Sequence, residues 1–170
     1  MKLHTRLFLL LSSALVPLVT IELGLAQTVR PVLSSHAQGL NGAVAPVVKV
    51  WSGSGVNINF LATGETIIRA WIDDPAKIVL DFDEPLCSDL VTEDCQGGNP
   101  SIIRLRRVTG LNFSNLPSAP STLLTVVTEA PAGLRRLYNF RVETGVGTPE
   151  YHTITMMPDA AGRPVIVLSN

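Results

Sequence analysis

Short apolar runs whose members alternate with polar residues recur along most of the chain. Val56, Ile58 and Phe60 alternate with two asparagines, so one face of this segment is apolar and the other is polar. The run over residues 78–82 repeats the same period of two. Because side chains of a β-strand point alternately to its two faces, each run predicts a half-buried strand.

The same pattern predicts about nine strands, separated by turn residues such as glycine, proline and aspartate. They span Val47–Trp51, Val56–Phe60, Thr66–Trp71, Ile78–Phe82, Ile102–Arg106, Leu123–Thr128, Leu137–Val142, Tyr151–Met157 and Val165–Leu168. Beyond the first 26 residues no window sustains the helical period of 3.6, and the 12 prolines of the chain interrupt helices. We therefore predict an all-β fold, an antiparallel β-sandwich or open barrel.

The region before the first of these strands lacks any sustained period. Residues 27–44 mix prolines, serines and glycines, and we expect a flexible arm there. A single β domain would then occupy residues 45–170. Residues 110–120 are rich in asparagine, serine and proline, which predicts a long surface connection.

Residues 1–26 have the order of a secretory signal peptide. A basic start precedes an almost wholly apolar run over residues 7–21, and small residues suit cleavage after Ala26. The alternative is a retained membrane anchor, but Pro17 and Glu22 interrupt the apolar run. No cysteine directly follows the cleavage site to carry a lipid. We therefore predict a periplasmic or extracellular mature chain with no stable membrane insertion.

Removal of the leader changes the length and the net charge of the chain. Cleavage would leave 144 of the 170 residues, a length typical of one domain. Two of the 13 basic and one of the 14 acidic residues fall in the leader, so the mature net charge is about −2. This charge attracts neither nucleic acid nor anionic lipid. We therefore expect proteins or glycans as partners, and no nucleic acid.

The only two cysteines are Cys87 and Cys95, and an exported compartment lets them form a disulfide. This bond would close a short polar loop and contribute about 2 kcal/mol, chiefly by fixing that loop. Two thiols without a nearby histidine argue against zinc. We expect no cofactor.

No set of residues suited to catalysis stands out. His36 falls in the expected arm, and His152 is expected on a sheet surface, so neither is a good general base. Gly53-Ser54-Gly55 lacks the lysine of a phosphate-binding loop and predicts a hairpin turn. The acidic group around Asp81 and Asp83 lacks the spacing of a calcium loop, so we expect a solvated strand end and no metal. The sequence therefore predicts no enzyme.

Arginines are frequent in the second half of the chain. If the strands that carry them lie side by side, they would present a charged surface to partner proteins; the alternative is edge protection and cross-strand ion pairs. The candidate partner surface consists of Arg104, Arg106, Arg107, Arg136 and Arg141. Trp51 and Trp71 are expected to pack in the core or on a sheet, and the alternative is a platform that stacks on sugars.

Two parts of the sequence carry a resemblance to a known family. Residues 56–67 read V-N-I-N-F-L-A-T-G-E-T-I, and residues 121–128 read S-T-L-L-T-V-V-T, followed at 136–142 by R-L-Y-N-F-R-V. They resemble the I-x-F-x-x-G-E-x-I, T-x-L-x-V-x-T and R-x-Y-x-F patterns of the TrbG/CagX-type subunit of periplasmic type IV secretion and conjugation core complexes. Each of the two parts corresponds to a predicted hairpin, with Gly64 in the turn of the first.

This resemblance covers roughly residues 47–157, although the connection over 83–120 departs from the family's pattern. It implies a non-catalytic structural or accessory component of a conjugation or type IV secretion apparatus. Such a component would bind envelope proteins through sheet edges and through the loop between Cys87 and Cys95.

A second stretch is similar to another exported family. Residues 75–82 read P-A-K-I-V-L-D-F, similar to a strand of the AMIN domain, a β-sandwich that targets envelope proteins to peptidoglycan or assembly sites. This similarity implies a peptidoglycan- or glycan-binding module as the alternative function. Its candidate glycan contacts are Trp51, Trp71, Asp81 and Asp83.

Overall fold

The computed structural model describes residues 28–86, 99–108, 110–116 and 119–159. These residues form nine strands, one short α-helix and two 3-10 turns. In chain order the elements are β1 (Val29–Leu33), α1 (Ser34–Ala37), η1 (Leu40–Gly42), β2 (Val47–Trp51), β3 (Val56–Asn59), η2 (Leu61–Thr63), β4 (Thr66–Ile72), β5 (Ile78–Phe82), β6 (Ile102–Arg107), β7 (Ser121–Glu129), β8 (Arg135–Gly145) and β9 (Thr153–Met157).

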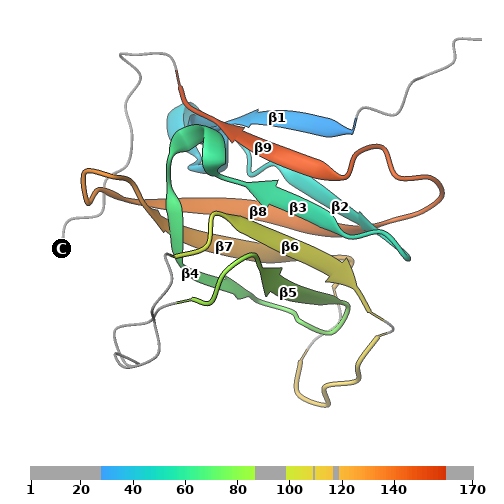
Figure 1. Ribbon diagram of the computed structural model, residues 1–170. Coiled ribbons are helices and arrows are strands. Elements are labelled where there is room, and N and C mark those ends of the chain that lie inside the picture. The colour runs from blue at the N-terminus through green and yellow to red at the C-terminus, as the bar shows by residue number, and fades with distance from the viewer. Residues whose placement is uncertain (1–27, 87–98, 109, 117–118, 160–170) are drawn as a thin grey trace, which may run out of the picture.

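The strands form two sheets (Figure 1). One has five strands in the order β1-β9-β3-β6-β5, and the other has four in the order β2-β8-β7-β4. The predicted all-β class is confirmed, but the sheets are mixed where an antiparallel arrangement was expected. The pairs β1–β9, β2–β8 and β3–β9 are parallel. Strands next to each other in a sheet often come from distant parts of the chain, and local alternation does not specify the direction in which they meet.

The alternation of apolar residues turns one face of each sheet toward a shared core. Ile58 of β3 and Ile154 of β9 face this core from the five-stranded sheet, and Tyr138, Phe140 and Val142 of β8 face it from the other. Each of these side chains is at most 1% exposed.

Eight of the predicted strands are present, with small differences at their ends. The ninth, at 165–168, lies outside the described residues, as do residues 1–26, Cys87 and Cys95.

The expected flexible arm is wrong for the described residues 28–44. β1 pairs in parallel with β9, and Ala37 of α1 is fully buried. Pro31 sits in the middle of β1, which is an edge strand and so tolerates a residue without an N–H group. The sequence of an edge strand this short shows no clear period, and its place comes from pairing with β9.

The glycine turns are present, but they do not form hairpins. Gly53 and Gly64 both adopt the left-handed conformation, with φ of 72° and 67°. The first lies between β2 and β3 and the second between β3 and β4, and in each case the two strands belong to different sheets. The hairpins expected around these glycines are therefore wrong, because each turn carries the chain across the sandwich.

Candidate functional site

A fully buried carboxylate lies where the chain crosses from one sheet to the other. Glu65 follows Gly64, whose left-handed backbone ends η2, and comes directly before β4. Its side chain has no exposed surface. An unpaired charge in such a place would be very costly, so the surrounding groups decide whether the fold can hold it.

Three side chains from the four-stranded sheet satisfy Glu65. The Thr128 hydroxyl of β7 and the Arg136 guanidinium of β8 each donate a hydrogen bond to it, and Arg136 also pairs with its charge. The Tyr138 hydroxyl lies 3.0 and 2.9 Å from the two carboxylate oxygens. We call these four residues the Glu65 cluster. Arg136 and Tyr138 occupy alternate positions of β8, and Thr128 lies opposite Arg136 on β7. Their side chains are therefore on the inner face of the four-stranded sheet.

Burial and neighbouring groups raise the pKa values of two members of the cluster, Tyr138 and Arg136. Burial raises the pKa of Tyr138 well above its ordinary value, so its hydroxyl remains a donor. Burial is the largest single effect on Arg136 and opposes its charge, but Glu65 and Tyr138 together outweigh it, so the pKa of Arg136 is raised. Tyr138 and Arg136 therefore both keep their protons at neutral pH and remain donors to Glu65.

The Glu65 cluster also reaches the N-terminal segment. The hydroxyl of Ser34, in α1, lies 3.4 Å from the Tyr138 oxygen. Beside it, Ser35 donates to the Asp159 carboxylate through both its backbone N–H at 2.7 Å and its hydroxyl at 2.6 Å. α1 is thus tied to β8 and to the segment that follows β9. Because Glu65 is sealed from solvent, this cluster stabilises the fold and has no access to a substrate.

Two of the four sheet edges are closed. On β2, the Lys49 N–H donates to the Tyr151 hydroxyl at 2.9 Å, and Arg30 donates to the Val47 carbonyl at 2.9 Å. On β1, Pro31 occupies a position that faces away from β9 and has no N–H to offer. These are recognised ways to prevent an edge strand from pairing with another chain. Figure 1 shows β1 on the side of the sandwich opposite β4 and β5.

The edges formed by β4 and β5 are open over part of their length, although the Ile67 N–H at the start of β4 donates to the Pro100 carbonyl at 2.6 Å. The N–H of Asp73 bonds to β7, so by the alternation of an antiparallel ladder the backbone groups of Ala70 and Ile72 face away from β7. By the same alternation, the backbone N–H and carbonyl groups of Ile78 and Leu80 in β5 face away from β6. No described residue hydrogen-bonds to these outward groups. A strand of another protein can therefore pair with them.

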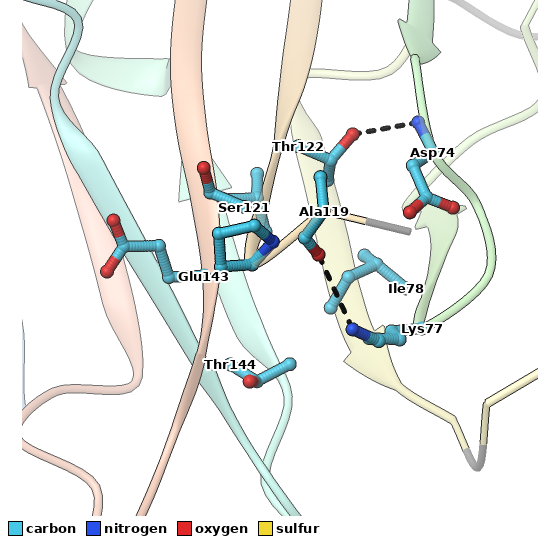
Figure 2. A pocket seen from close by; sticks show the side chains of 10 residues that line it. Asp74, Lys77, Ile78, Ala119, Ser121, Thr122, Glu143 and Thr144 are labelled. Carbon is cyan, nitrogen blue, oxygen red and sulfur yellow. Dashed lines mark hydrogen bonds between the residues drawn. The ribbon is translucent and has the colours of Figure 1, made fainter. Parts of the chain in front are cut away.

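The end of β4 is held firmly against the neighbouring strand. A small cleft of about 10 Å³ lies beside the connection from β4 to β5, and Figure 2 shows the residues that line it. The Asp74 N–H donates to the Thr122 hydroxyl at 2.8 Å, and the Lys77 ammonium donates to the Ala119 carbonyl at 3.4 Å. These two bonds connect the segment between β4 and β5 to the start of β7 and to the residue Ala119 that precedes it.

The predicted arginine surface is not continuous. β6 lies in the five-stranded sheet and β8 in the four-stranded one, so their arginines do not form one stripe. Arg104 bonds to Asn57 at 3.3 Å, Arg106 pairs with Asp81 at 3.8 Å, and Arg107 donates to a backbone carbonyl. On β8, Arg136 belongs to the Glu65 cluster, while Arg141 is exposed and pairs with Glu143. Most of these arginines make ion pairs or hydrogen bonds within their own sheet, and β6 is not an edge strand.

The candidate glycan contacts are also dispersed. Trp51 is 2% exposed and packs edge-to-face on Tyr151, with ring centres 5.2 Å apart. Trp71 is 42% exposed on β4, whereas Asp81 is exposed on β5 in the other sheet. The Asp83 carboxylate accepts two backbone N–H groups at the start of β6. Only Trp71 remains accessible for stacking.

The remaining candidates for chemistry do not assemble into a site. His152 is exposed just before β9, with its Nδ1 atom 3.1 Å from the Ser54 hydroxyl, and no carboxylate of a described residue orients its ring. Within the described ranges, no group of three or more histidine, cysteine, aspartate or glutamate side chains is placed to hold a metal.

The helices of the described part are too short to span a bilayer. No protein-family model and no curated protein matches this sequence.

The sequence did not single out Glu65 or its role. A signal was present, because a lone glutamate stands between the apolar runs of β3 and β4 while Thr128, Arg136 and Tyr138 occupy inward positions of their strands. Polar residues at inward positions of predicted strands indicate a buried polar cluster. Which of them meet depends on the pairing of β7 with β8.

Proposed function

We propose that this protein is an exported, non-catalytic binding module that holds protein neighbours by strand addition at its open β4–β5 side. The observation that carries this proposal is the difference between the edges. Side-chain bonds and a proline close β1 and β2, whereas the outward groups of Ala70 and Ile72 in β4, and of Ile78 and Leu80 in β5, have no partner among the described residues. Strand addition takes its affinity from main-chain hydrogen bonds and its specificity from alternate side chains.

Within this class, we place the protein in a periplasmic conjugation or type IV secretion apparatus, as an accessory or core component. Support comes from the segments that resemble the TrbG/CagX-type subunit. Glu65 comes from the first part, and Thr128, Arg136 and Tyr138 come from the second. The four residues meet in one buried cluster. The resemblance therefore includes residues that act together, as well as residues that merely favour strands.

The alternative, an AMIN-like module that binds peptidoglycan, has less support. Its favourable feature is Trp71, which is 42% exposed on the outer face of the four-stranded sheet. Trp51 is buried, and Asp81 lies on the other sheet. A sugar platform needs an accessible aromatic face with polar groups beside it, and these residues do not provide that arrangement.

A strand-blocking variant tests the proposal. Ala70→Pro removes an outward N–H group of β4 without removing a hydrogen bond to β7. The protein exported with its own leader should capture a defined set of envelope proteins, and Ala70→Pro should lose most of that set. Val146→Asp, at a residue 95% exposed in a loop, is the matched control and should capture the full set. Retention on purified peptidoglycan with no protein captured would favour the alternative.

Export and the disulfide have a separate test. Mass spectrometry of the exported protein should show a chain that begins at Gln27 and weighs two hydrogens less than its reduced form. Two thiols that alkylate freely without reductant would refute a bond between Cys87 and Cys95. An intact residue Met1 in the exported protein would refute cleavage and favour a retained anchor.

A further inference from the structure

The open stretch of β4 is complementary to itself. We propose that β4 pairs antiparallel with β4 of a second copy of this chain, about a two-fold axis that passes beside Trp71. Two four-stranded sheets would then join into one sheet of eight strands, a symmetric dimer interface of the isologous kind. This inference rests on the proposed function, since it assigns a partner to the same β4 edge.

The backbone of β4 permits this register. Its one irregularity lies between Ile67 and Arg69, and from Arg69 to Ile72 the strand pairs regularly with β7. With the axis beside Trp71, Ala70 lies opposite Ile72 of the second copy, and Ile72 lies opposite its Ala70. Both residues direct their N–H and carbonyl groups outward, so each pair exchanges two hydrogen bonds, about four in all.

The side chains on the outer face match in the same register. Arg69 lies opposite Asp73 of the second copy, and Asp73 lies opposite its Arg69. All three outer-face residues, Arg69, Trp71 and Asp73, are exposed. Neither Arg69 nor Asp73 has an ion-pair partner among the described residues. These positions form the closer type of cross-strand pair, in which opposite charges attract and like charges repel, and the two Trp71 rings meet between them.

The β5 edge is a weaker candidate for the same pairing. Its backbone is also open at Ile78 and Leu80, but its charged side chains already have partners. Lys77 donates to the Ala119 carbonyl, and Asp81 pairs with Arg106 and accepts the Phe82 N–H group. Charge complementarity with a second copy is therefore available at β4, where the charges have no partner within the described fold.

A charge-swap series tests the dimer. The exported protein should sediment as a concentration-dependent dimer. Arg69→Glu places two glutamates opposite two Asp73 carboxylates, and Asp73→Arg places arginines opposite Arg69, so each single variant should dissociate about tenfold more readily. The double variant Arg69→Glu/Asp73→Arg restores opposite charges and should recover the dimer. Arg141→Glu, an exposed substitution on β8, is the control and should leave the dimer unchanged.

Trp71 provides an independent signal, because its exposed ring becomes covered in the dimer and its fluorescence should shift to shorter wavelength as the protein associates. Circular dichroism should show every variant folded, since the substituted side chains are exposed. A wild-type protein that stays monomeric would overturn the dimer. So would single variants that still dimerise, or a double variant that does not recover. If the monomer still captures envelope proteins and Ala70→Pro abolishes that capture, the dimer fails while the proposed function stands.

Discussion

Replacing Arg136 by methionine should strongly destabilise the protein. The substitution keeps most of the side-chain volume but removes the cation that pairs with Glu65, whose carboxylate has no exposed surface. Only the neutral hydroxyls of Thr128 and Tyr138 would remain as donors. Removing one partner of a buried ion pair costs about 3–5 kcal/mol. Domains have a total stability of about 5–15 kcal/mol, so Arg136→Met should consume a large part of it.

Urea unfolding followed by tryptophan fluorescence measures this cost, because Trp51 is 2% exposed in the folded state. Arg141→Met is the matched control. It lies on the same strand, its side chain is 51% exposed, and its ion pair with Glu143 is worth at most about 1 kcal/mol. In a Glu65→Gln background no buried charge is left unpaired, so Arg136→Met should cost about 2 kcal/mol less than in the wild type.

The reasoning about the Glu65 cluster would be refuted by either of two results. One is an Arg136→Met variant that loses no more stability than Arg141→Met. The other is strict additivity between Glu65→Gln and Arg136→Met, because residues that share one buried network should show a coupling energy.

Three further predictions concern Tyr138, Gly145 and Tyr151. Burial holds the pKa of Tyr138 well above its unfolded value of about 10. The contribution of Tyr138 to the free energy of unfolding is therefore complete below that pH and declines above it by up to about 1.4 kcal/mol per pH unit. In urea titrations, the stability advantage of wild type over Tyr138→Phe should shrink at alkaline pH. Gly145→Ala would place a Cβ atom 2.6 Å from Nε1 of the buried Trp51, so thermal unfolding should show a loss of about 1–3 kcal/mol. Tyr151→Phe removes the acceptor of the Lys49 N–H group, which should cost about 1 kcal/mol and speed hydrogen exchange at that amide.

Each of these has an internal control. A constant difference between wild type and Tyr138→Phe from neutral to alkaline pH would contradict the first. Gly110→Ala, where nothing lies within 4 Å of the added Cβ, should leave stability nearly unchanged, and an equal loss at both glycines would contradict the second. In Tyr151→Phe the amide of Val50, which faces β8, should keep its slow exchange. Uniformly faster exchange would indicate a general loss of stability and contradict a local role at the β2 edge.

Strands with a strong period were predictable because the alternation of apolar and polar residues is present within each strand itself. β2 and β5 begin and end at the predicted residues, and β3 and β6 differ from prediction by one residue at one end. β1 was missed for the opposite reason. It is five residues long with Pro31 at its centre, and a strand of this kind is identified by the partner beside it. The open and closed edges could not be predicted from the sequence either, because an outward N–H group is defined only once the order of the strands is known.

The sequence alone determines the all-β class, the positions of most strands and the face that each strand buries, because the period of two is a local property of the chain. The tertiary structure decides which strands meet and in which direction, and the functional inferences depend on those choices. Glu65, Thr128, Arg136 and Tyr138 are up to 73 residues apart in pairs and become one cluster only when β4, β7 and β8 pair. The same pairing leaves β4 as the last strand of its sheet. Contacts between distant segments depend on the whole arrangement of strands, which no local pattern encodes.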